Sequence, residues 1–286
     1  MRFADIKNDV AFRKIFGNKK KTKILISFLN AVLQLEGKQR IASVKIENPY
    51  QFPRIAGEKS SIIDVRATDE SDRQFIVEMQ VAEPDGFDKR VQYYASRDYS
   101  MQIEKGEGYT KLKPTVFIGI LNFGYFSGED YLSYHSLLDE KTYESKLKDI
   151  RFAFIELTKF KKKEPELNNL IDKWAFFIKN APKLEVIPDS VDDEGLREAY
   201  LDADKHKWKK AELIAYDNAS IAEQDEKGKI TAAEKKGKIE GKIEGKIEGR
   251  IEVAKKLIKR QLTNEEIAED TGLTIEQIKQ LRNEKP

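Results

Sequence analysis

The pattern of hydrophobic and polar residues predicts helices and strands that alternate along the chain as far as about residue 180. Apolar side chains at helical spacing predict helices over 5–16, 22–35, 87–105 and 166–178. Runs rich in β-branched and aromatic residues predict strands over 43–47, 60–67, 73–81, 115–123, 131–138 and 150–157. Strands and helices that intermingle in this way predict one α/β or α+β domain.

Two of these strands, 60–67 and 73–81, form a predicted hairpin, because the polar residues between them are turn-forming types. If the turn centres on Ser71, then Asp64 lies directly opposite Glu78. Side chains alternate between the faces of a strand, which predicts one polar face with Asp64, Arg66, Ile76, Glu78 and Gln80. The other face is wholly apolar and is expected to face the core, with Ile63, Val65, Phe75, Val77, Met79 and Val81. Two carboxylates that face each other repel, so this pairing implies a cation between them.

Beyond Pro188 the composition shifts towards lysine, glutamate, aspartate and alanine. Residues 237–252 read GKIE three times and then GRIE. On a helix this spacing makes separate ridges of glycine, basic, isoleucine and glutamate side chains. Each glycine costs roughly 1 kcal/mol relative to alanine, so an isolated helix here is expected to be poor. The segment is therefore either a low-complexity spacer or a helix that packs against another helix.

The last residues predict two short helices, capped by Thr263 and Thr274 and separated by Gly272. This is the helix-turn-helix pattern, with a small apolar core formed by Ile267, Ala268, Leu273, Ile275, Ile278 and Leu281. About 25 residues are too few for an independent DNA-reading domain, so docking on a partner chain is favoured over base reading. Residues 235–260 hold ten Lys or Arg against four Glu, an excess that could steer the tail towards phosphates.

The composition limits the kinds of catalytic and metal-binding sites that the chain can form. Charged residues make up 36% of the chain and hydrophobic residues 40%, which is typical of a soluble protein. No apolar run is long enough for a membrane helix and the N-terminus lacks a signal-peptide core, so we expect no membrane partner and a cytoplasmic location. The absence of cysteine and the presence of only two histidines disfavour thiolate, cysteine–zinc and histidine-based sites. Carboxylates are the remaining candidate groups, and their oxygen atoms suit hard divalent cations such as Mg²⁺. A net charge of +2 means that any nucleic-acid binding must use local patches.

Six segments occur in an order that matches a known family. They are KNDVAFRKIFG (7–17), IDV (63–65), VEMQV (77–81), RVQYYASRDYSMQI (90–103), GEGYTKLKPTVFIGILNF (106–123) and IELTKF (155–160). Over about residues 1 to 180 the chain resembles the Rpn family of recombination-promoting nucleases and transposases, which belongs to the PD-(D/E)XK nuclease superfamily. The Gly-Lys-Glu-rich tail with its terminal helical hairpin is also similar to that of family members.

The resemblance implies a restriction-endonuclease-like αβββαβ core, in which helices flank a mixed central sheet, followed by an α-helical C-terminal extension. We assign the nuclease-like domain to residues 1–185 and a helical connector to 186–236. The repeat helix or linker is then 237–262 and the helix-turn-helix-like hairpin is 263–286.

The resemblance also implies roles for individual residues. Asp64 and Glu78 match the family's two acidic positions, and Gln80 stands where lysine is usual. Asp64, Glu78 and Asp9, the last on the first helix, are the expected metal ligands. Arg90, Tyr94 and Gln102 fall where the family's second core helix carries recurrent polar and aromatic residues, either to touch DNA or to support the site.

The implied function is that of a metal-dependent DNA endonuclease, linked to recombination or mobile elements, that uses Mg²⁺ or Mn²⁺. Glutamine at position 80 cannot carry a charge or act as a base, so a slow or conditionally activated enzyme is a natural outcome. Two alternatives stay open at this point. One is a DNA-binding protein that does not cut DNA, and the other is an assembly module that forms a homodimer through the C-terminal helical region.

Overall fold

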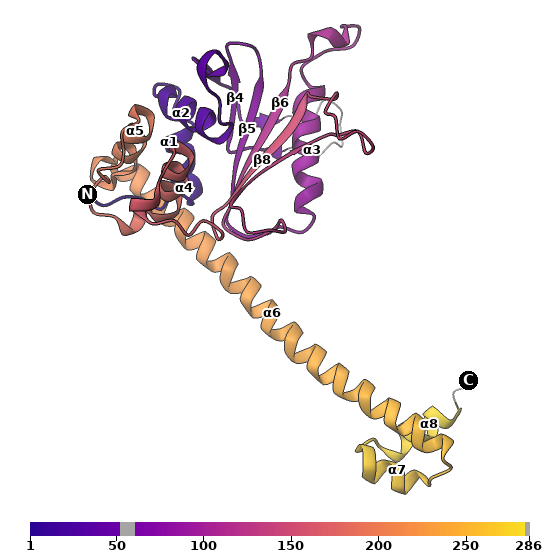
Figure 1. The fold of residues 1–286 in the computed structure, drawn as a ribbon. Helices are drawn as coiled ribbons and strands as arrows, with labels where there is room; N and C mark the ends of the chain where they lie inside the picture. The colour runs from indigo at the N-terminus through magenta and orange to yellow at the C-terminus, as the bar shows by residue number, and fades with distance from the viewer. Residues whose placement is uncertain (52–60, 284–286) are drawn as a thin grey trace. The chain divides into compact units, whose positions relative to one another are not determined.

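The computed structural model describes residues 1–51 and 61–283, in which a six-stranded mixed sheet is the central element (Figure 1). The strand order is β1-β4-β5-β6-β8-β7. The strands are β1 (Val44–Ile46), β4 (Val65–Asp69), β5 (Gln74–Gln80), β6 (Thr115–Leu121), β7 (Leu132–Ser136) and β8 (Ile150–Glu156). Strands β5, β6 and β8 are parallel to one another, whereas the other pairs in the sheet are antiparallel. The predicted α/β class with a mixed sheet is confirmed.

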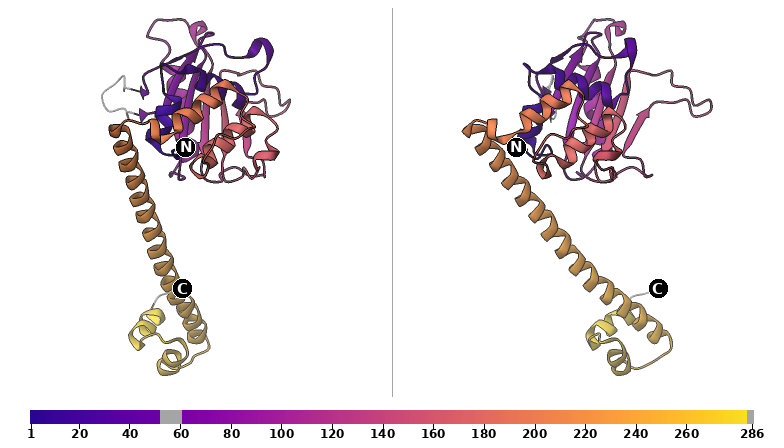
Figure 2. Two further views of the ribbon diagram at one scale, coloured as in Figure 1. Left: turned by 90° about the vertical axis from the view of Figure 1, so that its left-hand side faces the viewer. Right: turned by 60° about the vertical axis from the view of Figure 1, so that its left-hand side comes forward.

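Helices cover both faces of this sheet. Helices α1 (Asp9–Phe16), α2 (Thr22–Val32), α4 (Leu170–Asn180) and α5 (Glu194–Ala203) lie on one side, and α3 (Phe87–Ser100) lies on the other (Figure 1). In the left-hand view of Figure 2 the larger group of helices lies in front of the sheet. The order α2-β1-β4-β5-α3-β6 reproduces the expected αβββαβ core. Strand β6 is buried along its whole length, which explains its unbroken apolar sequence.

The larger core lies between the sheet and the four helices. It is built from fully buried rings that contact one another edge to face, among them Phe16, Phe28 and Trp174. Helix α5 belongs to this core through Leu196 and Tyr200. Its Gly195 lies so close to α2 that a β-carbon there would be 2.5 Å from the carbonyl oxygen of Lys23. The first compact unit therefore extends beyond residue 185, as far as Ser220.

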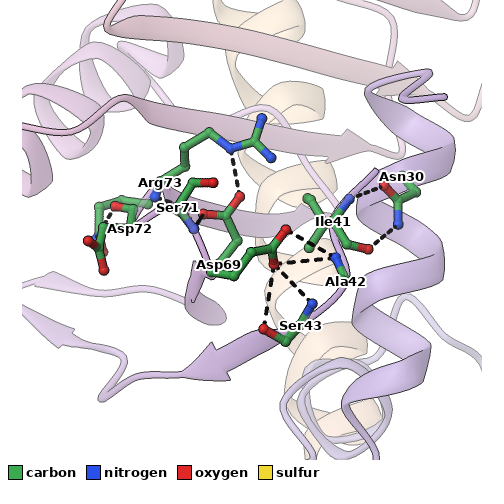
Figure 3. A network of polar contacts seen from close by, with 10 residues as sticks. Asn30, Ile41, Ala42, Ser43, Asp69, Ser71, Asp72 and Arg73 are labelled. Atoms are coloured by element: carbon green, nitrogen blue, oxygen red, sulfur yellow. Dashed lines mark hydrogen bonds and ion pairs between the residues drawn. The ribbon is translucent and has the colours of Figure 1, made fainter. Parts of the chain in front are cut away.

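The hairpin has the predicted register. Val65 pairs with Val77 and Thr68 with Gln74, which centres the turn on Ser71. Figure 3 shows the carboxylate of Asp69 facing the turn, where it accepts bonds from the backbone N–H groups of Ser71 and Arg73, both at 2.9 Å. The guanidinium of Arg73 donates to the same carboxylate at 2.6 Å. The next pair beyond Val65 and Val77 in this register is Asp64 and Glu78, so the turn determines the position of both acids.

The prediction of a single core face was wrong. A second core lies beneath α3, and it includes Ile63, Ile76 and Val91. Ile63 was expected on the opposite face, but β4 begins only at Val65 and the chain bends at Asp64, so strand alternation does not extend to it. The polar face is covered as well, because Arg66 pairs with the buried Asp98 of α3 at 2.5 Å.

The predicted strand over 60–67 is divided. Its first described residues form β3 (Ser61–Ile62), which pairs with β2 (Tyr50–Gln51) in a separate two-stranded sheet, and Ser60 lies outside the described residues.

Several helix ends also differ from the prediction. Helix α1 begins at Asp9 rather than at residue 5, because the side chain of Asn8 caps it by accepting the N–H groups of Val10 and Ala11. Helix α2 ends at Val32, α3 ends at Ser100, and α4 begins at Leu170 after the capping Asn169.

The second compact unit comprises residues 221–286, of which 284–286 lie outside the described residues. Helix α6 (Lys210–Lys259) includes the whole repeat as continuous helix. Helices α7 (Asn264–Thr271) and α8 (Ile275–Asn283) follow, with Gly272 in the left-handed conformation at φ 67° between them. Their apolar core contains Ile267, Leu273 and Ile278 as predicted, whereas Ile275 is exposed. Among the described residues, no helix combines the length and the apolar character that crossing a bilayer requires.

Candidate active site

Asp64 and Glu78 lie side by side at the start of β4 and near the end of β5. The backbone N–H of Asp64 donates to Oε1 of Glu78 at 3.2 Å. In return, the N–H of Met79 donates to Oδ2 of Asp64 at 2.9 Å. Glu78 is 2% exposed and Asp64 9% exposed. Each carboxylate is thus held by the backbone of the other strand, and the two acids converge as the hairpin register predicted.

Helix α1 contributes a cation that the sequence analysis missed. Arg13 donates to Oδ1 of Asp64 through Nη2 at 2.9 Å and through Nε at 3.2 Å. The same Nη2 lies 3.2 Å from Oδ1 of Asp9, one turn earlier on the helix. Arg13 therefore links two of the predicted acids. The available signal was its four-residue spacing from Asp9 within KNDVAFRKIFG, which places both side chains on one face of the helix.

The site carries more negative charge than Arg13 neutralises. Burial, and secondly the charge of Asp64, raise the pKa of Glu78 to about 8, although Arg90 and Arg13 act in the opposite direction. Burial and the charge of Asp64 likewise raise the pKa of Asp9 to about 6, against the effect of Arg13. A further cation at this point would favour the ionised form of these carboxyl groups.

Gln80 lies beside Glu78, as strand alternation predicts. Its amide nitrogen donates to Oε2 of Glu78 at 3.0 Å, so it orients that carboxylate without adding charge. Helix α3 brings Arg90 and Tyr94 towards the same acids. The guanidinium carbon of Arg90 lies 5.1 Å from the centre of the Tyr94 ring, and burial raises the pKa of the Tyr94 hydroxyl. Arg90 and Tyr94 therefore form the wall of the site on the α3 side.

Gln102 has a different position from Arg90 and Tyr94. It follows the C-terminal end of α3, where its amide nitrogen donates to the carbonyl oxygen of Lys113 at 3.0 Å and to Oγ1 of Thr115 at 3.1 Å. Its side-chain oxygen accepts the N–H of Lys113 at 2.7 Å. Both ends of this amide thus bind the segment that leads into β6, and Gln102 supports the sheet.

The donor chemistry fits a hard divalent cation, because Asp64, Glu78 and the Gln80 amide offer oxygen ligands. Oδ2 of Asp64 and both carboxylate oxygens of Glu78 each accept one of the bonds described above and keep a second lone pair, whereas Oδ1 of Asp64 accepts two bonds from Arg13. In the described part of the chain, no group of three or more Asp, Glu, Cys or His side chains is arranged to hold a metal ion. Asp9 is thus not in a preformed ligand set with the other two acids, and Arg13 is bonded to it and to Asp64. The Arg13 side chain is 44% exposed, so solvent reaches the guanidinium beside Asp64.

Comparison with known proteins gives one family. The model of the family described as PD-(D/E)XK nuclease family transposase matches residues 6–233, which include every candidate site residue named above. No curated protein matches the chain significantly. No solved structure does so either.

Proposed function

The chain belongs to the PD-(D/E)XK nuclease family transposases, and on that premise we propose that it is a metal-dependent endonuclease that hydrolyses phosphodiester bonds in DNA. Membership of this family supports a nuclease or transposase-related function with DNA as substrate. The observation that carries the finer proposal is the convergence of Asp64 and Glu78, with the pKa of Glu78 raised to about 8. Two buried carboxylates held this close are stabilised by a bound cation.

In this proposal Asp64 and Glu78 hold Mg²⁺ or Mn²⁺, and Asp9 is available as a third acid on α1. A divalent ion bound there would lower the pKa of a coordinated water and neutralise charge on the scissile phosphate. The chain's own residues position these groups. Met79 and Asp64 hold the carboxylates through their backbone N–H groups, and Gln80 orients Glu78 through its amide.

Gln80 and Arg13 are expected to affect the rate of DNA cleavage. Gln80 has no charge to offer the transition state, whereas a lysine at that position would supply one. Arg13 carries a positive charge within hydrogen-bonding distance of Asp64. With a divalent ion held by Asp64, the Arg13 guanidinium would be available to an incoming phosphate, for which its planar geometry is suited. We therefore propose a slow enzyme in which Arg13 takes over part of the role of the absent lysine.

A plasmid-cleavage assay tests this proposal. Supercoiled plasmid incubated with the full chain and Mg²⁺ or Mn²⁺ should become nicked and linear, because the metal supplies the charge that Gln80 lacks. Addition of excess chelator should stop the reaction, since without the ion nothing in the proposed site lowers the pKa of the attacking water or neutralises charge on the scissile phosphate. Cleavage of equal rate with and without chelator would contradict a metal-dependent mechanism. An unchanged plasmid under all metal conditions would favour the alternative of a DNA-binding protein that does not cut.

A second candidate function, homodimeric assembly, is favoured by one observation on α6. Ile239, Ile243 and Ile247 of the repeat are 53%, 53% and 41% exposed, and they form a ridge along the helix. A β-carbon added at the repeat glycines would meet open space, so a partner helix could approach closely. We expect the full chain to have twice its monomer mass in light scattering and a chain without residues 237–286 to be monomeric. If the full chain and the chain without residues 237–286 have the same oligomeric state, assembly through this region is contradicted.

A further inference from the structure

A group of lysines lies outside the candidate active site and has no assigned role. The lysine cluster comprises Lys7, Lys161, Lys162, Lys163, Lys179 and Lys183. Lys161, Lys162 and Lys163 lie in the connection from β8 to α4, and Lys179 and Lys183 lie in and just after the last turn of α4. A cavity of about 410 Å³ opens among them, lined by Lys161, Lys162, Lys163 and Lys179 together with Phe160, Glu164, Phe176 and Asn180.

Part of this positive charge has no neutralising partner among the residues that the structure describes. Lys162 pairs with the buried Asp172 at 2.8 Å, and Lys7 pairs with Asp5 at 2.6 Å. In residues 1–51 and 61–283, by contrast, the ammonium groups of Lys161 and Lys183 have no ion pair. Within the same described ranges, Lys179 donates only to a backbone carbonyl, that of Phe160 at 2.5 Å. The cluster can therefore accept negative charge from outside the protein.

The lysines of the cluster repel one another. Partial burial and the positive charges of Lys183, Lys161 and Lys7 lower the pKa of Lys179. Lysines normally spread apart on a surface to avoid this cost. A geometry that holds them together around a cavity is stabilised when an anion binds.

The cluster lies along the same edge of the sheet as the candidate active site. Gln80 of β5 is in register with Leu121 of β6, which is in register with Glu156 of β8. The three parallel strands thus end at one edge, and neighbouring strands are about 4.8 Å apart, so the end of β8 lies about 10 Å from the end of β5. Helix α1 connects the two places, because Asp9 interacts with Asp64 whereas Lys7, two residues earlier, repels Lys179.

We propose that the lysine cluster binds the backbone phosphates of duplex DNA beside the bond that the Asp64–Glu78 site cleaves. This inference rests on the proposed function. Because both places lie at one edge of the sheet, a duplex seated at the acids can continue over the lysines. Lysines bind phosphates as point charges and read no base, so the cluster supplies affinity and orientation without sequence preference.

The test compares the full chain with its Lys161→Gln/Lys183→Gln double variant. Fluorescence anisotropy measures affinity for two unrelated duplexes over a series of salt concentrations, with Ca²⁺ in place of Mg²⁺ as the oxygen-binding divalent ion. The slope of log affinity against log salt should become shallower by about 2, and affinity at low salt should fall about tenfold for both sequences. Because Lys161 and Lys183 are exposed, thermal unfolding should not change.

The matched control is Lys141→Gln/Lys148→Gln. These lysines are equally exposed and lie in the connection from β7 to β8, at the opposite end of β8 from the cluster. The control should bind like the natural chain. An equal loss in the control, or an unchanged slope in the cluster variant, would overturn the inference while binding by the natural chain still supports the proposed function. Failure of the natural chain to bind either duplex would overturn both.

Discussion

Replacement of Asp64 by alanine is expected to abolish DNA cleavage, with a loss of at least about 10²–10³-fold in rate. Asp64 is held by Arg13 and by the N–H of Met79, so its carboxylate has one defined position beside Glu78. Removal of that carboxylate leaves a single acid in the pair and weakens the hold on a divalent ion. The measurement is the initial rate of plasmid nicking with Mg²⁺ at fixed protein concentration.

The matched control for this variant is Asp85→Ala, which removes an exposed carboxylate from the loop that follows β5. It should cleave at the rate of the natural chain. Asp64→Ala should still bind duplex DNA, because the change removes a negative charge and leaves the lysine cluster intact. Cleavage by Asp64→Ala at more than a tenth of the natural rate would show that the hydrolytic site lies elsewhere.

Replacement of Glu78 by glutamine is expected to stabilise the metal-free protein at pH 8 while it abolishes cleavage. The pKa of Glu78 is raised from 4.5 to about 8, so between these pH values the folded state holds a proton that the unfolded state lacks. The free energy of unfolding therefore falls as the pH rises from about 4.5 to about 8. Glutamine does not ionise, so the free energy of unfolding of Glu78→Gln does not fall in this way. We expect the free energy of unfolding of the variant to exceed that of the natural chain by about 4 kcal/mol at pH 8 and to match it near pH 4.5.

Thermal unfolding from pH 4.5 to pH 8, with chelator present, measures this difference. The control Glu83→Gln changes an exposed carboxylate in the loop that follows β5. Its unfolding temperature should depend on pH in the same way as that of the natural chain. Added Mg²⁺ should raise the unfolding temperature of the natural chain at pH 8, since the ion binds ionised Glu78, and should raise that of Glu78→Gln less. Parallel pH profiles for the natural chain and Glu78→Gln would mean that Glu78 carries its charge in the folded protein without penalty.

These predictions concern a site whose main pair could be found from the sequence. The positions of Asp64 and Glu78 follow from strand alternation and from a turn centred on Ser71, and both are local properties of the segment 64–78. The buried strand β6 and the two capped helices α7 and α8 were predictable for the same reason, since run length and capping residues act within one element.

Other parts of the site depend on contacts between distant segments. Arg13 reaches Asp64 across 51 positions of the chain, and no local pattern states that α1 packs at that edge of the sheet. Ile63 lies under α3 because β4 begins at Val65, so the bend before the strand overrides its alternation. Gln102 falls with Arg90 and Tyr94 in the predicted helix 87–105, yet α3 ends at Ser100 and Gln102 binds the segment leading into β6.

The sequence by itself determined the fold class, the hairpin register and the pairing of two acids, because periodicity and turn chemistry act over short distances along the chain. Only the tertiary structure decided which cation faces Asp64, that both sheet faces are buried, and that lysines from three separate segments meet beside the site. The physical reason is that burial and electrostatic coupling arise from proximity in space. Lys7, Lys161 and Lys179 become neighbours only when the helices close over the sheet.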